Sequence, residues 1–185
     1  MTKTIYHVSS SIDGFIAGAG DSLAWLYEIP PADRDVSRFI AGIGAVVMGA
    51  TTYECVLRDA QLLAHPERWQ EAQGDRPAWV FTHRKLPEVP AADIRFVSGD
   101  VRPVHRAMTS AARGRNIWIA GGGALATAFA EAGLLDQVFL AVAPVMLADG
   151  KPLFTGSLTA SRLRLSNVGR LGQVAYLTYD VLPGS

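Results

Sequence analysis

The sequence has few of the residues that build covalent or metal-held scaffolds. Only one of its 185 residues is a cysteine, Cys55, so the chain cannot form an internal disulfide or a cysteine-based metal cage. Its four histidines, at positions 7, 65, 83 and 105, do not have the spacing of metal ligands, and we expect no metal site. Cys55 itself lies among apolar residues of a predicted helix, which favours a small core residue. A reduced, cytoplasmic setting is the simplest interpretation of this cysteine usage.

Net charge and long apolar runs are also absent. Lysine plus arginine and aspartate plus glutamate number 17 each, so the molecule as a whole has no field that attracts nucleic acid or an anionic membrane. No apolar run reaches the roughly 18 residues that a membrane span needs. The first residues have the alternating, β-branched pattern of a strand and not the pattern of a signal peptide. We therefore expect no nucleic-acid or membrane partner, and any phosphate must be bound by a local site.

The residues that are present suffice for one folded core. Hydrophobic residues make up 49% and charged residues 18% of the sequence, as in ordinary globular proteins, and 185 residues fit one domain over residues 1–185. Strand and helix patterns alternate along most of the chain, whereas the last strands follow one another directly. This order predicts an α/β three-layer sandwich with a central mixed, mostly parallel sheet and a C-terminal antiparallel hairpin. Strands are expected at residues 4–9, 45–48, 78–82, 94–97, 117–119, 137–145, 163–168 and 174–181. Helices are expected at 33–40, from Thr51 or Thr52 to 57, at 66–72, 100–113 and 124–132, and a glycine-rich loop at 11–26.

Three consecutive glycines, Gly121, Gly122 and Gly123, separate a predicted strand from a predicted helix. Glycine permits a positive φ and lets a ligand approach the backbone without a Cβ in the way. The first N–H groups of the following helix lie unpaired at its positive end, where a phosphate can bind. A phosphate site and a tight turn without a ligand are both compatible with these residues.

A second strand-to-helix turn has the same construction, with Gly49 ending the strand and Thr51 or Thr52 available as a helix cap. Ligands of open α/β sheets gather at the carboxyl ends of parallel strands, so an extended dinucleotide could lie across both turns. The third strand leads to Thr82, His83, Arg84 and Lys85 at the same edge. A cation there could meet a phosphate, or the charges could form a solvated turn.

Six segments in this order resemble the dihydrofolate reductase-like superfamily, which includes the C-terminal reductase domain of riboflavin biosynthesis, the bacterial deaminase-reductase domain family. They are residues 11–17, 47–54, 118–123, 133–136, 144–147 and 150–154. The resemblance implies a dihydrofolate reductase-like fold, a homodimer, and an NADPH-dependent oxidoreductase that transfers hydride to a small pterin- or pyrimidine-like heterocycle.

The resemblance also assigns roles to particular residues. Ile16 and Ala17 would approach the nicotinamide, and Trp25 would close the substrate side. The phosphates would be held by Gly49, Thr51, Thr52, Gly121, Gly122, Gly123, Ala124 and Leu125. Thr82, His83 and Arg84 would lie near the adenosine ribose.

Three positions depart from the family pattern. Ala50 stands where an arginine often meets the extra phosphate of NADPH, so Arg84 or Lys85 would have to replace it. Riboflavin-pathway reductases usually carry a lysine in place of Phe15 and a glutamate in place of Ala120. These departures argue against 5-amino-6-(5-phosphoribosylamino)uracil reductase, which stays as an alternative. Folate reduction and a non-catalytic NADPH-binding dimer are two further alternatives.

Two carboxyl groups are candidates for delivering the proton that reduction of a C=N bond requires. Asp33 follows Pro31 and Ala32. Dihydrofolate reductases have a catalytic Pro-Ala-Asp sequence, and they place it as many residues before the corresponding strand end as Asp33 lies before Gly49. Alternatively, Asp33 caps a helix after the two prolines. Asp13, in a Ser-x-Asp-Gly turn, is the second candidate, although such a residue commonly stabilises its own turn.

Overall fold

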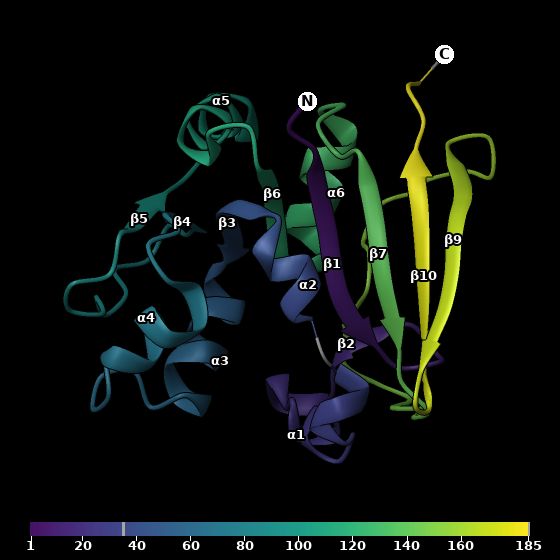
Figure 1. Ribbon diagram of the computed structural model, residues 1–185, viewed down its shortest axis with the longest axis horizontal. Coiled ribbons are helices and arrows are strands. Elements are labelled where there is room, and N and C mark those ends of the chain that lie inside the picture. Colours follow the sequence, from purple (N-terminus) through teal and green to yellow (C-terminus); the bar gives the residue numbers. More distant parts are fainter. Residues whose placement is uncertain (35, 185) are drawn as a thin grey trace.

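The computed structural model describes residues 1–34 and 36–184, and its centre is one twisted sheet (Figure 1). The strands of this sheet follow the order β5-β4-β3-β6-β1-β7-β10-β9. Their bounds are β1 (Thr4–Ser10), β3 (Ile43–Gly49), β4 (Ala78–Phe81), β5 (Ile94–Val97), β6 (Asn116–Gly121), β7 (Gln137–Val142), β9 (Leu163–Leu171) and β10 (Val174–Val181). Pairing is parallel from β5 to β7, and β10 runs antiparallel to both β7 and β9. The predicted mostly parallel sheet with a C-terminal antiparallel hairpin is confirmed.

Helices cover both faces of the sheet. They are α1 (Ala24–Tyr27), α2 (Ser37–Ala41), α3 (Ala50–Asp59), α4 (Glu67–Gln73), α5 (Val101–Ala112) and α6 (Gly123–Glu131), with short 3₁₀ helices η1 (Ala19–Asp21) and η2 (Pro31–Arg34). The side chains of β3 alternate between the two faces: Ala45 and Val47 pack with α5 and α6, whereas Val46 and Met48 pack with α3 and α4. This alternation produces the three layers. No helix of the described chain is long and apolar enough to cross a membrane.

Several local predictions were wrong. The helix expected over residues 33–40 is split into η2 and α2, because the N–H of Asp33 bonds to Pro30 three residues back and closes a 3₁₀ turn instead of an α-helical one. Helix α3 begins at Ala50 with Gly49 as its N-cap and has no side-chain cap from Thr51 or Thr52. The loop expected at 11–26 contains β2 (Phe15–Ala17), η1 and α1, and β2 pairs with β8 (Lys151–Pro152). Strand β7 ends at Val142, and β9 continues to Leu171.

The close packing of α5 on β3 depends on Gly44. A Cβ at this position would lie 2.8 Å from the Cα of Ala112 and closer still to its carbonyl oxygen, both backbone atoms of the last turn of α5. Backbone cannot rotate away as a side chain can, so only glycine lets the helix approach this closely.

We therefore predict that Gly44→Ala destabilises the protein by about 1–3 kcal/mol, the usual cost of overpacking a core. Urea denaturation at equilibrium measures this free energy. Gly169→Ala is the matched control, because a Cβ there would meet the Tyr176 Cβ at an ordinary 3.9 Å. Equal stability of Gly44→Ala and wild type would contradict this account of the α5–β3 contact.

Candidate active site

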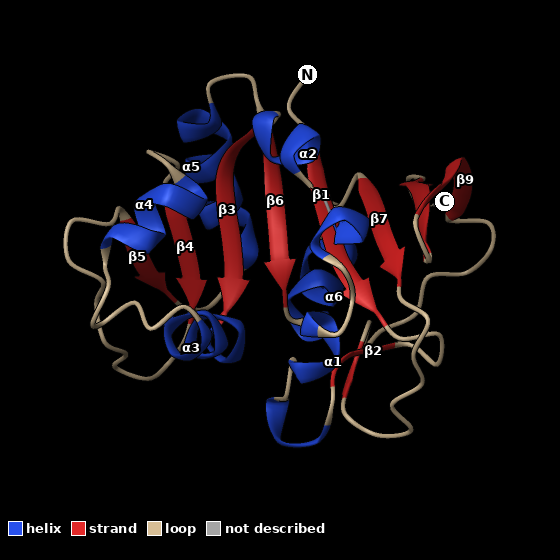
Figure 2. Cartoon of the chain, turned by 60° about the horizontal axis from the view of Figure 1, so that its bottom comes forward, coloured by secondary structure: helices blue, strands red, loops and turns tan. Residues whose placement is uncertain are grey.

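A cavity of about 520 Å³ opens at the carboxyl ends of β3, β6 and β1. In Figure 2 these strands end at the edge where α3 begins and where β2 and α1 lie. The residues lining the cavity are His7, Val8, Ser9, Ile16, Ala17, Asp21, Leu23, Trp25, Leu26, Val36, Thr51, Thr52, Cys55, Val56, Trp118, Ala120, Gly121, Gly122, Gly123, Ala124, Lys151, Pro152 and Thr155. Its size is that of a small-molecule site. Among residues 1–34 and 36–184, no cluster of three or more His, Cys, Asp or Glu side chains is arranged to hold a metal ion.

One wall of the cavity is backbone, because the glycine turn after β6 touches its neighbours without side chains. A Cβ on Gly121 would lie 2.7 Å from the Oγ1 of Thr52, and one on Gly123 would lie 2.9 Å from the carbonyl oxygen of Leu153. Gly122 has φ +92°, a conformation that favours glycine. The three glycines thus bring the turn after β6 directly against the start of α3 and against the segment after β8.

The helices α3 and α6 both begin at this wall. Their N-caps are Gly49 and Gly122, and neither helix start has a side-chain cap, whereas the Asp100 carboxylate caps α5. The first N–H groups of a helix have no partner within it and carry the positive end of its dipole. Two such helix starts at one cavity make a site suited to an anionic group.

The floor of the cavity contains a buried histidine. The His7 ring is stacked on Phe139 at 4.3 Å and meets the edge of Phe39 at 4.3 Å. Its side chain is 5% exposed, and burial lowers the pKa of His7 to about 4. The imidazole is therefore neutral at physiological pH. Trp118 donates from Nε1 to the His7 carbonyl at 2.9 Å, which fixes this part of the floor.

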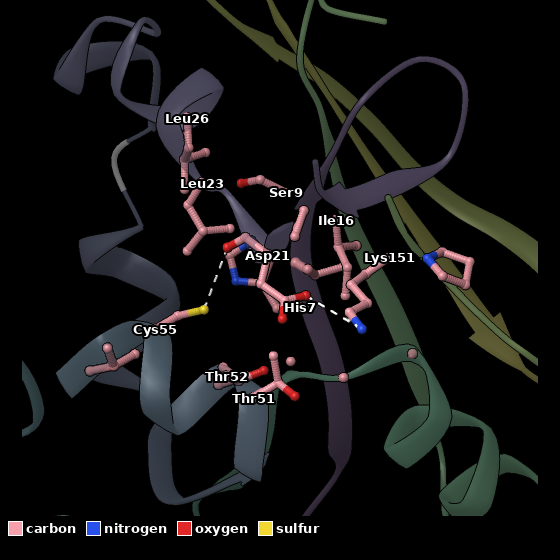
Figure 3. A pocket seen from close by; sticks show the side chains of 18 of the residues that line it. His7, Ser9, Ile16, Asp21, Leu23, Leu26, Thr51, Thr52, Cys55 and Lys151 are labelled. Carbon is pink, nitrogen blue, oxygen red and sulfur yellow. Dashed lines mark hydrogen bonds and ion pairs between the residues drawn. The ribbon is translucent and has the colours of Figure 1, made fainter. Parts of the chain in front are cut away.

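A charged pair lies at one side of the cavity (Figure 3). Asp21 Oδ1 lies 3.4 Å from Lys151 Nζ, and the Cys55 thiol donates to the Asp21 carbonyl at 3.6 Å. Lys151 reaches this position because Gly150 lets β8 pass against the backbone of Ala17. Asp21 and Lys151 supply the formal charges among the described residues of the lining, since His7 is neutral. Burial raises the pKa of the Cys55 thiol, as expected for a core cysteine.

Comparison with known proteins places the chain in a family. The model of the RibD C-terminal domain matches residues 2–177. The chain belongs to the RibD C-terminal domain family. Among curated proteins, the uncharacterized protein YwjB of Bacillus subtilis is 31% identical over 178 residues, which cover 96% of this chain and 97% of that protein.

Solved structures confirm the dihydrofolate reductase-like fold. A putative riboflavin biosynthesis protein from Shewanella sp. PV-4 has a TM-score of 0.72 at 23% identity, covering 98% of this chain and 100% of that one. Dihydrofolate reductase from Enterococcus faecalis, complexed with NADP(H), has a TM-score of 0.63 at 16% identity, covering 98% of this chain and 97% of the other. The resemblance stated from sequence is confirmed at the level of family and fold.

Most residues predicted to bind a cofactor lie together in this RibD C-terminal domain. Ile16, Ala17, Thr51, Thr52, Gly121, Gly122, Gly123 and Ala124 line the cavity, and so does Trp25, which was predicted for the substrate side. Gly49 caps α3, and its backbone nitrogen lies 3.9 Å from where a Cβ of Gly122 would be. Leu125 packs its side chain into the core instead, among the residues around Phe129.

The cluster Thr82, His83 and Arg84 follows β4 at the same sheet edge and lies outside the cavity lining. The Thr82 hydroxyl accepts from the Arg84 N–H at 2.9 Å, and Arg84 makes a bidentate ion pair with Glu54 at 2.9 and 2.7 Å. Both side chains of the pair are exposed, with 58% and 40% of their surface in contact with solvent, so a competing anion can replace Glu54 at little cost.

The two predicted acids do not line the cavity, and both bind loops instead. The Asp33 carboxylate accepts from the Gln173 N–H at 3.1 Å in the β9–β10 turn, and its carbonyl accepts from Tyr176 at 2.8 Å. The Asp13 carboxylate accepts from the N–H groups of Leu147 and Ala148, at 3.1 and 2.8 Å. Hydrogen bonds to the Asp13 carboxylate hold its pKa below its usual range, and the bond with the Ser11 side chain has the largest effect. The geometry therefore does not favour either as a proton donor in the cavity.

Sequence reasoning missed several lining residues, above all His7, Asp21 and Lys151. Lys151 lies in segment 150–154, which carried the family resemblance, so that signal could have found it. Asp21 belongs to none of the six resembling segments and enters the cavity only because η1 folds back over α3. No local pattern marks His7 as a cavity residue either.

The lowered pKa of His7 predicts a specific loss of stability in acid. The unfolded chain binds a proton near pH 6.5, whereas the folded protein binds it only near pH 4, so stability falls as pH decreases between these values. A shift from 6.5 to about 4 corresponds to about 3 kcal/mol. Urea denaturation between pH 4 and 7 should show this decline in wild type and in the exposed-histidine control His83→Gln. His7→Phe should lose the part of the decline that His7 contributes and keep the part from His105, whose pKa burial also lowers. Parallel curves for His7→Phe and wild type would refute the assignment.

Proposed function

We propose that this protein is an NADPH-dependent reductase that transfers hydride from the nicotinamide to a small pterin- or pyrimidine-like heterocycle. One observation carries the proposal: two helix starts without side-chain caps meet a backbone wall of glycines at one cavity. Membership in the RibD C-terminal domain family supports it. A structural neighbour from Thermotoga maritima is named as a deaminase and 5-amino-6-(5-phosphoribosylamino)uracil reductase.

The residues present fit a dinucleotide. The glycine wall leaves no room for a Cβ at Gly121 or Gly123 but exposes backbone to the cavity, which is what close approach of a pyrophosphate requires. The starts of α3 and α6 would hold the phosphates through their N–H groups. The adenosine half would then follow the sheet edge from β3 to β4, toward Thr82, His83 and Arg84.

The other end of the cavity is apolar. Ile16 and Ala17 bring β2 alongside, and Leu23, Trp25 and Leu26 close the side opposite α3. NADPH, when bound, supplies the hydride. The chain's own contribution is to orient the nicotinamide and substrate against each other and to exclude water from the reacting faces.

A reduced ring nitrogen also needs a proton. Asp33 and Asp13 are engaged with loops, so neither is positioned to supply it. Asp21 is the carboxyl group among the described lining residues, and we assign to its carboxylate the orientation of a bound water that delivers this proton.

The second candidate is 5-amino-6-(5-phosphoribosylamino)uracil reductase. The activity for which the Thermotoga neighbour is named favours it, although that likeness, with a TM-score of 0.67 at 18% identity, covers only 57% of the neighbour. Ala120 lines the cavity and, like Phe15, provides no side-chain polar group for a phosphoribosyl chain. We also propose that the chain forms a homodimer, and an NADPH-binding dimer without turnover is a third candidate.

Thermal denaturation with NADPH, NADP⁺ and NADH tests the proposal. A nucleotide at a hundredfold excess over its dissociation constant stabilises the native state by about 2.7 kcal/mol, a rise of roughly 5–10 °C in a chain of this size. Ala124→Glu should keep or raise the stability of the free protein, since an acid favours a helix start, yet it should abolish most of the shift. Asn167→Asp, the same charge change on the exposed face of β9, should behave as wild type. If none of the three nucleotides raises the melting temperature, the reductase proposal is wrong.

Variants of Arg84 and of Glu54 should change NADPH binding in opposite directions. If Arg84 binds the extra phosphate of NADPH, Arg84→Met should weaken NADPH binding about tenfold and leave NADH binding unchanged. Glu54→Gln removes the competing carboxylate and should strengthen NADPH binding. Fluorescence titration of both nucleotides measures these constants. Equal effects on NADPH and NADH would show that Arg84 does not distinguish them.

A further inference from the structure

Buried polar atoms without hydrogen-bond partners gather at the cavity. Five such side-chain atoms occur among the described residues, and three of them belong to cavity-lining residues: His7 Nδ1, Asp21 Oδ1 and Trp25 Nε1. Folded proteins leave few buried polar atoms unpaired, because each loses its hydrogen bonds to water without replacement. Their concentration in one lining suggests that a ligand completes these hydrogen bonds.

Trp25 offers a donor whose position is fixed. Trp25 is 6% exposed and belongs to a buried cluster. It packs with Ile29, which follows α1, and with Ala141, Ala143 and Val174, which lie in or next to β7 and β10. The indole Nε1–H can only donate. A ligand that satisfies Trp25 must therefore present an acceptor, such as a ring carbonyl.

Asp21 offers the complementary acceptor. It closes η1 in the left-handed region at φ +61°, with its carbonyl held by the Cys55 thiol. Its Oδ1 faces Lys151 Nζ at 3.4 Å, an ion-pair distance that does not make a hydrogen bond. The Lys151 side chain is 55% exposed and long enough to swing aside. A ligand N–H can then donate to the carboxylate while Lys151 still balances its charge.

We propose that Asp21 and Trp25 together bind an amide edge of the substrate heterocycle, with the ring N–H or amino group donating to Asp21 and the neighbouring ring carbonyl accepting from Trp25. This inference rests on the proposed reductase function and narrows its substrate class to lactam-type rings. Asp21 comes from η1 and Trp25 from α1, so the segment over residues 19–27 selects the substrate, whereas the starts of α3 and α6 serve the cofactor. In Figure 3, Asp21 lies between Leu23 and the pair Thr51 and Thr52.

Three pteridines separate the two hydrogen bonds. Pterin has both the carbonyl and the donors, 2,4-diaminopteridine lacks the carbonyl, and lumazine has a second carbonyl in place of the amino group. Their binding constants follow from fluorescence titration of the whole protein. Wild type should bind pterin about tenfold more tightly than 2,4-diaminopteridine, the effect of one hydrogen bond or slightly more.

Each variant should then change one preference. Asp21→Asn keeps the left-handed backbone, which asparagine tolerates, and should weaken pterin binding about tenfold or more, because a neutral amide oxygen is a weaker acceptor than the carboxylate. Trp25→Phe should weaken pterin and lumazine about fivefold and leave 2,4-diaminopteridine unchanged. Asp93→Asn is the matched control, because it removes the same charge and an exposed ion pair with Arg95 outside the cavity, and pterin affinity should stay within about twofold of wild type.

The outcomes are distinguishable. The inference is overturned if the wild-type protein binds neither pterin nor lumazine. It is also overturned if Asp21→Asn leaves the pterin binding constant unchanged, which is the result expected if ordered water satisfies the carboxylate. An Asp93→Asn loss equal to that of Asp21→Asn would assign the effect to the change in net charge and overturn the inference. If the Asp21 and Trp25 variants weaken NADPH binding and leave pterin binding unchanged, the two residues bind the nicotinamide carboxamide, which has the same amide edge, and the inference is wrong.

The failure of the reductase proposal would look different. If the protein prefers pterin to 2,4-diaminopteridine as predicted but no nucleotide raises the melting temperature, the reductase proposal fails and the amide-edge site stands. Asp21 ends the short helix η1 and its side chain is 33% exposed, so Asp21→Asn still tests the inference if Trp25→Phe misfolds.

Discussion

The structure depends on the close approach of two strand-to-helix turns at the middle of the sheet. Because β3 and β6 are neighbours, the turn after β6 must pass directly against the start of α3, and Gly121 does so within the space that Thr52 leaves. The same turn meets the backbone after β8 at Gly123. Side chains at these glycines would push apart α3, α6 and the β2–β8 pair, and the cavity between them would lose its shape. The cavity is thus a consequence of sheet order combined with the absence of Cβ atoms.

The electrostatics of the cavity arise locally, since the chain has no net charge. Helix starts supply partial positive charge at one wall, and the apolar walls keep that field from being screened by water. Burial holds His7 neutral, so the floor adds no competing cation. The Asp21–Lys151 pair is balanced and lies at the side. An anionic ligand is therefore favoured at the helix starts, while a neutral, hydrogen-bonding ring is favoured near Asp21.

The fold and half of the site could be predicted from the sequence because their signals are local. Gly121, Gly122 and Gly123 mark a turn in which a Cβ would collide or φ is positive, and the order of strands and helices fixes the sheet type. The assignment of Asp33 failed for the opposite reason. Its spacing from Gly49 matched a known motif, but its side chain is held by Gln173, a contact 140 residues away that no local pattern reveals. Asp21 and His7 were missed likewise, because the cavity is closed by segments that meet only in the folded chain.

The most direct test of the account is an amide-resolved NMR titration of the protein with NADPH. The account predicts that the backbone N–H signals of Thr51, Thr52, Gly123 and Ala124 shift together at one binding constant, because both helix starts hold the same phosphates. Signals of Ile16 and Ala17 should shift with NADPH but less with a fragment that carries the adenosine phosphates without the nicotinamide. Saturable shifts confined to other parts of the chain, or shifts at only one helix start, would contradict the shared cofactor site.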